Sequence, residues 1–146
     1  MIAIDTDVLA VHHIFHNDPR YATTRDFFTR IEGGPWAITV FNLLELSGIF
    51  ASANRAIESK AVFEKYLRAG NVLIVFPVLT TGDAKRFWEV VTFECFDRIQ
   101  KGMRLGDAAI LWALETNREV DTFVTWNTKH FKGKTSLKIL TPSEFL

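Results

Sequence analysis

Short apolar runs alternate with longer segments in which apolar residues recur at helical spacing. The apolar runs predict five strands, over residues 1–4, 36–39, 72–76, 122–125 and 138–140. The longer segments predict helices over residues 8–16, 19–31, 42–53, 55–69, 83–101 and 107–116, with a last helical turn over 141–144. No hairpin signal joins two strands, so the pattern favours a parallel sheet covered on both faces. The predicted fold class is α/β, a three-layer α/β/α sandwich with a parallel central sheet of four to five strands.

One predicted helix has clear signals at its start. Asp18 is a typical N-cap and Pro19 suits the first helical position, so we expect a helix from there to Ile31. Tyr21, Phe28 and Ile31 share one face of that helix, which predicts that this face packs on the core.

Three features carry predictions about burial. Residues 107–116 are apolar nearly all round, which predicts a helix buried on most sides. Residues 72–76 form a continuous apolar run closed by Pro77, as is typical of a buried parallel strand. Cys95 lies on the apolar face of helix 83–101 and is expected to be a core residue.

Aromatic residues are abundant, with 13 Phe and 4 Trp. Such side chains fill cores, and they are also enriched at interfaces with partners. The simplest interpretation assigns three of them to the core, namely Trp36, Phe41 and Phe50. Phe93, Phe96 and Trp126 exceed what one core needs, which predicts that they cover an interface.

Length and composition are those of a compact soluble protein, with 146 residues, 48% hydrophobic and 23% charged. We therefore expect residues 1–146 to form a single domain. The 17 basic and 17 acidic residues cancel, so no global positive field attracts nucleic acid, and contact with phosphate must be local or mediated by a metal. A lone cysteine and the lack of any signal-peptide or membrane-spanning pattern predict a cytoplasmic location.

Polar residues follow several of the predicted strands. Asp5 comes directly after the first strand, and Asn127 follows residues 122–125 by two positions. Glu45 lies in the first turn of the helix after the second strand, and Asp107 opens the buried helix. Because ligands of parallel sheets bind outside the carboxyl ends of the strands, we expect these four side chains to face one crevice.

Each of these residues also has a purely structural interpretation. Asp5 and Asp7 can cap the helix that follows the first strand. Glu45 stands three residues after Asn42, an arrangement close to a capping box. Asp107 can be an ordinary N-cap, and Asn127 a turn residue.

Four ordered blocks nevertheless resemble the signature blocks of PIN-domain nucleases. They are IDTDVL at residues 4–9, Glu45 after the second strand, GDAAI at 106–110 and VTWNTKHF at 124–131. The closing TPSEFL, residues 141–146, is similar to the tail of many VapC-type toxins.

The resemblance implies an Mg²⁺- or Mn²⁺-dependent ribonuclease that is the toxin of a toxin-antitoxin pair. It further implies an RNA substrate, a cognate antitoxin protein as inhibitor, and a homodimer. Asp5, Glu45 and Asp107 would be the catalytic residues and metal ligands, with Asn127 where many members of the family have a fourth aspartate. A neutral amide at that position offers only its carbonyl oxygen to a metal.

Further residues take secondary roles in this interpretation. Thr6 and Thr125 are candidates to orient a ligand or a phosphate oxygen, and Arg104 and Lys129 to contact backbone phosphates. Asp7 stands where the family more often has Asn or Ser. It can replace some of the missing charge, but a helix cap is the favoured role.

The residue types suit metal-assisted hydrolysis of RNA. Clustered carboxylates repel one another and are neutralised by a divalent cation, which lowers the pKa of bound water and stabilises charge on the phosphodiester. A phospho-receiver domain is disfavoured, because the third strand runs into Pro77 where that class needs an acceptor aspartate. A PIN-like domain that binds RNA or protein without cleaving it stays open, because Asn127 weakens the acidic set.

Overall fold

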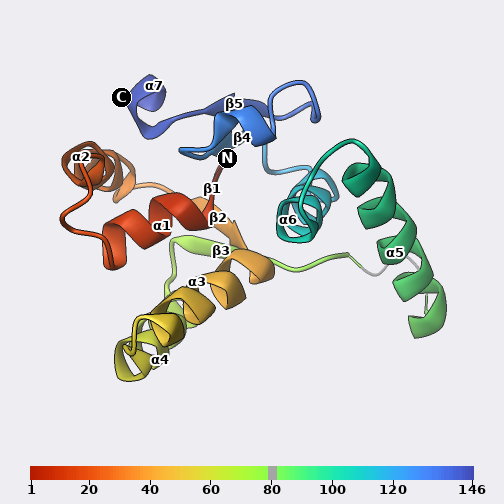
Figure 1. Ribbon diagram of the computed structural model, residues 1–146, viewed down its shortest axis with the longest axis horizontal. Coiled ribbons are helices and arrows are strands. Elements are labelled where there is room, and N and C mark those ends of the chain that lie inside the picture. Colours follow the sequence, from red (N-terminus) through yellow and green to blue (C-terminus); the bar gives the residue numbers. More distant parts are fainter. Residues whose placement is uncertain (79–81) are drawn as a thin grey trace.

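The computed structural model describes residues 1–78 and 82–146, and Figure 1 gives the arrangement of their elements. In chain order the elements are β1 (Ile2–Ile4), α1 (Thr6–His13), α2 (Tyr21–Ile31), β2 (Trp36–Thr39), α3 (Val40–Ser52), α4 (Ala56–Arg68), β3 (Val72–Val75), α5 (Ala84–Gln100), α6 (Leu105–Glu115), β4 (Thr122–Val124), the 3₁₀ helix η1 (Thr128–His130), β5 (Lys138–Leu140) and α7 (Pro142–Phe145).

The strands form one parallel sheet in the order β3-β2-β1-β4-β5. β1 is central, with Ala3 opposite Ala37 of β2 on one side and opposite Phe123 of β4 on the other. The chain builds outward from β1 through β2 and β3, and then crosses over to add β4 and β5 on the other side. The strand order therefore reverses beside β1, which is where parallel sheets bind ligands.

Helices cover both faces of this sheet. Successive residues of a strand point to opposite faces, so Ala3 and Phe123 join one hydrophobic cluster while Ile4 and Val124 join the other. The first cluster includes Leu111 and other residues of α6, and the second includes residues of α1, α2, α3 and α4. Figure 1 shows α5 and α6 on one side of the strands and α1 to α4 on the other. The predicted three-layer α/β/α architecture is confirmed.

The start of α2 differs from the prediction. The helix begins at Tyr21 with Arg20 as N-cap, and no side chain caps it. Asp18 instead accepts a hydrogen bond from the backbone N–H of Arg20 at 2.8 Å and pairs with its guanidinium, which closes a turn before the helix. The buried face of α2 is built on Phe27, which is 0% exposed, while Phe28 is only partly buried.

Predictions about burial were confirmed for some segments and wrong for others. Most of α6 is buried, as its composition indicates, and Cys95 is a core residue. β3 is less buried than predicted, because it is an edge strand and only Val75 is buried. α5 lies outside α6, so Phe93 (70%) and Phe96 (57%) are exposed. The prediction for Trp126 is wrong, because its ring is partly buried against the core and its Nε1 donates a hydrogen bond to Thr24 at 3.2 Å.

No helix among the described residues is long and apolar enough to cross a membrane.

The burial of Phe27 leads to a prediction about stability. Its ring packs against Phe28 and Phe145, with centroids 5.4 and 5.2 Å away. We expect Phe27→Ala to lower the free energy of unfolding by about 3–5 kcal/mol, because it removes a buried ring and leaves a cavity. Ile57→Ala, at a side chain that is 88% exposed, should change it by about 0.5 kcal/mol or less. Urea denaturation followed by circular dichroism measures both, and equal losses would contradict the packing described.

Candidate active site

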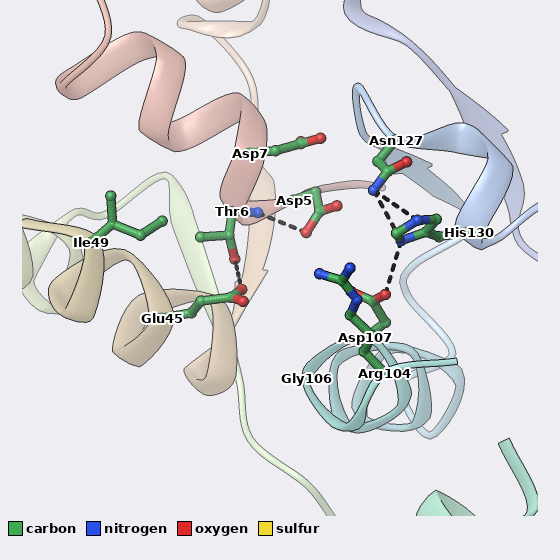
Figure 2. A pocket seen from close by; sticks show the side chains of 10 residues that line it. All are labelled: Asp5, Thr6, Asp7, Glu45, Ile49, Arg104, Gly106, Asp107, Asn127 and His130. Carbon is green, nitrogen blue, oxygen red and sulfur yellow. Dashed lines mark hydrogen bonds and ion pairs between the residues drawn. The ribbon is translucent and has the colours of Figure 1, made fainter. Parts of the chain in front are cut away.

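A cavity of about 330 Å³ opens at the carboxyl end of β1, where the strand order reverses. Figure 2 shows the side chains that line it. They include the four predicted site residues Asp5, Glu45, Asp107 and Asn127. The sheet and its helices thus bring together residues that are more than 120 positions apart in the sequence.

Asp5 is the innermost acidic residue of the cavity and is only 6% exposed. It is the N-cap of α1, and its Oδ1 accepts a hydrogen bond from the backbone N–H of Thr6 at 2.7 Å. Its Oδ2 accepts a hydrogen bond from the hydroxyl of Thr125 at 2.7 Å. Asp5 therefore caps the helix and lines the cavity at once, so the two interpretations of this residue do not exclude each other.

Asp7 is not the helix cap that the sequence favoured. Because Asp5 holds the N-cap position, Asp7 falls in the first turn of α1 and its carboxylate lines the cavity. Its Oδ1 accepts a hydrogen bond from the backbone N–H of Trp126 at 3.2 Å, and its Oδ2 one from the Thr125 hydroxyl at 3.3 Å. Thr125 thus contacts both carboxylates.

The electrostatics of this pair are unfavourable in the absence of a cation. Burial raises the pKa of Asp5 well above its usual range, and the charge of Asp7 raises it further. Burial also raises the pKa of Asp7, against the lowering effect of the hydrogen bond from the Trp126 backbone. The cavity therefore concentrates negative charge that its hydrogen-bond donors only partly offset.

Glu45 is not part of a capping box. The box forms one turn earlier, because Thr39 is the N-cap of α3 and exchanges hydrogen bonds with Asn42. The carboxylate of Glu45 is left to face the cavity, where its Oε2 accepts a hydrogen bond from the Thr6 hydroxyl at 2.5 Å. A Cβ atom built on Gly106 would stand 3.6 Å from Glu45 Oε1, so α3 and the start of α6 meet here.

Asn42 is a site residue that sequence analysis missed. Its side-chain oxygen accepts hydrogen bonds from Thr39, which leaves the amide nitrogen free to donate to the residues that line the cavity. That nitrogen lies 3.0 Å from the Thr6 hydroxyl oxygen and 3.3 Å from Asp5 Oδ1. Sequence analysis could have identified Asn42 from its spacing to Thr39 in strand β2, because Thr followed three residues later by Asn also fits a capping box.

Asp107 is not the N-cap of its helix either. α6 begins at Leu105 with Arg104 as N-cap, so Asp107 falls in the first turn and its side chain is free to face the cavity. Its Oδ2 lies 3.1 Å from Nδ1 of His130. The structural interpretation of Asp107 is therefore wrong.

His130 is a second residue of the cavity that the sequence did not single out. It stands at the end of η1, three residues after Asn127, and one 3₁₀ turn brings both side chains to the same side. The side-chain nitrogen of Asn127 lies 2.9 Å from Nδ1 of His130 and 3.3 Å from Nε2. The only feature of the sequence that could have identified His130 as a site residue is its place in the VTWNTKHF block, residues 124–131.

The four predicted substrate-binding residues lie in different places. Thr6 and Thr125 are buried and hydrogen-bond to carboxylates, whereas Arg104 lines the cavity at its exposed rim. Lys129 is exposed and does not line the cavity.

The donor set of the cavity fits a hard divalent cation. Carboxylate oxygens are the ligands that Mg²⁺ and Mn²⁺ prefer, and a cation would relieve the repulsion that raises the pKa of Asp5 and Asp7. As the side chains lie, no three His, Cys, Asp or Glu groups among the described residues come together closely enough to hold a metal. A cation would therefore have to draw the two walls of the cavity inward.

Two further histidines belong to a separate region. His12 and His13 line another cavity, of about 310 Å³, and His13 Nε2 lies 2.6 Å from the hydroxyl of Tyr66. Burial lowers the pKa of His12 to about 4 and that of His13 to about 3, so both are neutral at pH 7.

The raised pKa of Asp5 leads to a prediction about stability in metal-free buffer. A folded-state pKa above the usual value of 3.8 means that the folded protein binds more protons than the unfolded chain. The free energy of unfolding therefore falls as pH rises from about 4 through the raised pKa. We expect Asp5→Asn, which keeps the cap and removes the charge, to stabilise the protein at pH 7 by about 0.5–2 kcal/mol.

Thermal melts between pH 3 and 8 with EDTA measure this effect. The gain should shrink as pH falls through the raised pKa of Asp5 and disappear below about pH 4, where Asp5 is protonated in both the folded and the unfolded protein. The exposed control Asp26→Asn should show no gain. A variant Asp5→Asn that is less stable than the parent protein at pH 7 would refute the charge argument.

No protein-family model and no curated protein sequence matches the chain. Solved structures do resemble it. A chain of a toxin-antitoxin complex from Klebsiella pneumoniae is 16% identical, with a TM-score of 0.58, and the likeness covers 97% of this chain and 98% of that one. A chain of VapBC2 from Rickettsia felis, bound to a DNA fragment from their promoter, is 19% identical, with a TM-score of 0.62, and the likeness covers 95% and 97%.

At these identities the likeness is one of fold. It extends over nearly the whole chain and agrees with the parallel five-stranded sheet described above. The chain therefore has the α/β, PIN-like fold that its four blocks predicted, shared with chains of toxin-antitoxin complexes that include VapBC2.

Proposed function

We propose that this protein is a divalent-metal-dependent endoribonuclease and the toxin of a toxin-antitoxin pair. The observation that carries the proposal is the convergence of Asp5, Asp7, Glu45 and Asp107 on one cavity at the switch point of a PIN-like sheet. The raised pKa values of Asp5 and Asp7 support it, because a site built for a cation holds unneutralised charge when the cation is absent.

Asp5, Glu45 and Asp107 would hold Mg²⁺ or Mn²⁺, directly or through water, together with the carbonyl oxygen of Asn127. The bound metal would lower the pKa of a water molecule and stabilise charge on the phosphodiester. Thr6 and Thr125 would keep Glu45 and Asp5 in position through the hydrogen bonds described.

Substrate contacts follow from the charges around the cavity. Arg104 lines its exposed rim and would contact a backbone phosphate there. Lys129, on the outside of η1, would contact RNA only beyond the cavity. With a formal net charge of zero, the protein would attract RNA mainly through the metal and this rim.

Asp7 would take over the charge that Asn127 lacks. Its carboxylate lines the cavity and shares the Thr125 hydroxyl with Asp5. The cavity then holds four carboxylates although the position after β4 is neutral. This arrangement favours cleavage over the alternative, a PIN-like domain that binds RNA or protein without cutting it.

The proposal includes partners and organisation. Residues 1–146 would form a single nuclease domain, located in the cytoplasm and assembled as a homodimer.

A cognate antitoxin would bind an apolar surface next to the acidic cavity. This surface is a cavity of about 430 Å³ lined by Leu44, Trp88 and Leu105, and it shares Glu45 with the acidic cavity. Trp88 and Leu105 are 62% and 65% exposed.

The nuclease proposal is tested with purified protein and labelled RNAs, structured and unstructured, in Mg²⁺ or Mn²⁺. We expect cleavage that EDTA abolishes. Asp5→Asn and Asp107→Asn should each lower the rate by at least about 100-fold, because even the partners of metal ligands cost 10- to 100-fold when removed.

The matched control is Asp26→Asn, an exposed aspartate on α2 that should leave cleavage unchanged. Cleavage that survives both site substitutions and EDTA would remove the metal site from the mechanism. Metal binding without cleavage of any RNA would instead favour the non-cleaving alternative.

The toxin role has its own test in living cells. We expect controlled expression of the protein in a bacterial host to arrest growth, because hydrolysis of cellular RNA stops protein synthesis. Asp5→Asn, produced at the same level, should relieve the arrest. Growth curves with immunoblots measure both, and an arrest of equal strength in the variant would contradict the proposed role.

A further inference from the structure

We propose that the protein binds a nucleotide in a second cavity, which lies at the opposite end of the sheet from the acidic one. This cavity, of about 310 Å³, is lined by residues of α1, α2 and α4. Trp36 and Val72 also line it and are the first residues of β2 and β3, whereas the acidic cavity lies at the carboxyl ends of the strands. Nucleotide binding here would not require the proposed nuclease activity.

Aromatic rings form the apolar part of this second cavity. Five of them line it and contact one another in a closed circuit, with neighbouring centroids 4.1–5.8 Å apart. In the order of their contacts they are His12, Phe28, Trp36, Tyr66 and His13. Trp36 and Tyr66 are 6% and 5% exposed, while the other three are partly exposed. The rings of His12 and Phe28 thus offer a well-supported aromatic surface to a planar ligand.

The charges around the cavity favour an anion. Arg25 of α2 and Lys65 of α4 line it, and Glu32 is the one acidic side chain among the described residues that do so. Arg25 pairs with Asp26 at 3.0 Å, but Lys65 forms no salt bridge with any described residue. An anionic group of a ligand would therefore bind chiefly through Lys65.

His12 supplies a hydrogen-bond donor beside the aromatic surface. Burial and, to a smaller extent, the charge of Lys65 lower the pKa of His12 to about 4, so its ring is neutral at pH 7. Its Nδ1 is buried and has no hydrogen-bond partner among the described residues. Because a buried N–H without an acceptor is costly, the single proton of the neutral ring is favoured on Nε2. That N–H is then available to an acceptor on the ligand.

Two acceptors complete the lining of the cavity. Glu32 contributes its carboxylate, and Asn71 contributes its side-chain oxygen, because the Asn71 amide nitrogen donates to the backbone oxygen of Glu32 at 3.3 Å. These oxygens would accept hydrogen bonds from the amino group of a base or the hydroxyls of a ribose. The cavity thus combines an aromatic surface, a cation and hydrogen-bond acceptors.

A nucleotide carries the groups that complement all three. Its base would stack on the partly exposed rings, and its phosphate would pair with Lys65. A volume of about 310 Å³ suits one such unit, since cavities of about 300–1,000 Å³ hold ligands of drug size. A free nucleotide and one nucleotide of an RNA chain offer the same chemistry, so the experiment has to distinguish them.

The test measures binding to the full chain in EDTA, so that no cation in the acidic cavity can recruit a phosphate. The nucleotide probes are the four ribonucleoside 5′-monophosphates and the trinucleotide ApApA, which has no terminal phosphate. Inorganic phosphate and adenosine each carry one half of the recognition chemistry and serve as partial probes. Titrations followed by two-dimensional nitrogen-15 NMR give the Kd and show which residues change on binding.

Two variants remove one contact each. Lys65→Met removes the charge at an exposed position and keeps the length of the side chain, and its matched control is Lys60→Met, an exposed lysine of α4 that does not line the cavity. His12→Leu removes the ring and its N–H, and its control is His16→Leu, an exposed histidine outside α1. Melting temperatures in EDTA report whether each variant is folded.

We expect at least one nucleotide probe to bind the parent protein with a Kd below about 1 mM, and to shift the signals of Thr29 and Asn71 but not that of Asp107. Lys65→Met should raise this Kd about tenfold or more, because it removes a charged hydrogen bond. His12→Leu should raise it about fivefold or more, because it removes a stacking ring. Both controls should bind like the parent protein, and each partial probe should bind more weakly than the nucleotide.

The order of affinities identifies the source of the nucleotide. Tighter binding of a monophosphate than of ApApA would assign the cavity to free nucleotides, and the reverse order would assign it to a nucleotide of an RNA chain, so both results support the proposal. Four results would overturn it: no binding of any nucleotide probe, shifts confined to the acidic cavity, an unchanged Kd in Lys65→Met, or inorganic phosphate that binds as tightly as the nucleotides.

Discussion

The structure depends on how it accommodates a buried negative charge at the end of its central strand. Asp5 is enclosed where β1 ends, and its carboxylate lies next to that of Asp7. The donors on Asp5 come from Thr6 and Asn42 on two different helices and from Thr125 beyond β4. Three segments of the chain therefore have to be in place before this one side chain is satisfied, which links the order of the sheet to the geometry of the cavity.

The amino-terminal ends of two helices lower the free-energy cost of burying that charge. Asp5 is the N-cap of α1, Asp7 lies in its first turn, and Asp107 lies in the first turn of α6. The amino terminus of a helix carries a partial positive charge, so three of the four carboxylates stand where negative charge is favoured. The protein thus holds an acidic cluster through backbone dipoles, and it needs few basic side chains in the cavity. Arg104 lines the cavity and is exposed.

The sequence predicted the strands of the sheet well and the N-cap residues of the helices poorly, and both results have the same physical reason. Strand positions follow from apolar runs, and the parallel arrangement follows from their alternation with helices. Neither prediction changes when the end of a strand or helix is misplaced by one or two residues. The role of a polar side chain near a helix start changes completely with such an error. Moving the start of α3 from Asn42 to Val40 freed Glu45 for the cavity, and Asp5 as N-cap did the same for Asp7. In α2 the error was of another kind, because the buried face is centred on Phe27 and not on its neighbour Phe28.

The remaining site residues depend on contacts between distant segments. His130 and Asn42 carry no recognisable chemistry in the sequence, because each acquires its role only when β4 and α3 lie beside β1. In the proposed nuclease, Asp7 on α1 would supply the carboxylate that the position after β4 lacks, and the imidazole of His130 lies beside Asp107. Because Asp5 joins α1 to the central strand, that negative charge would lie on a more rigid part of the fold than the exposed turn that carries Asn127.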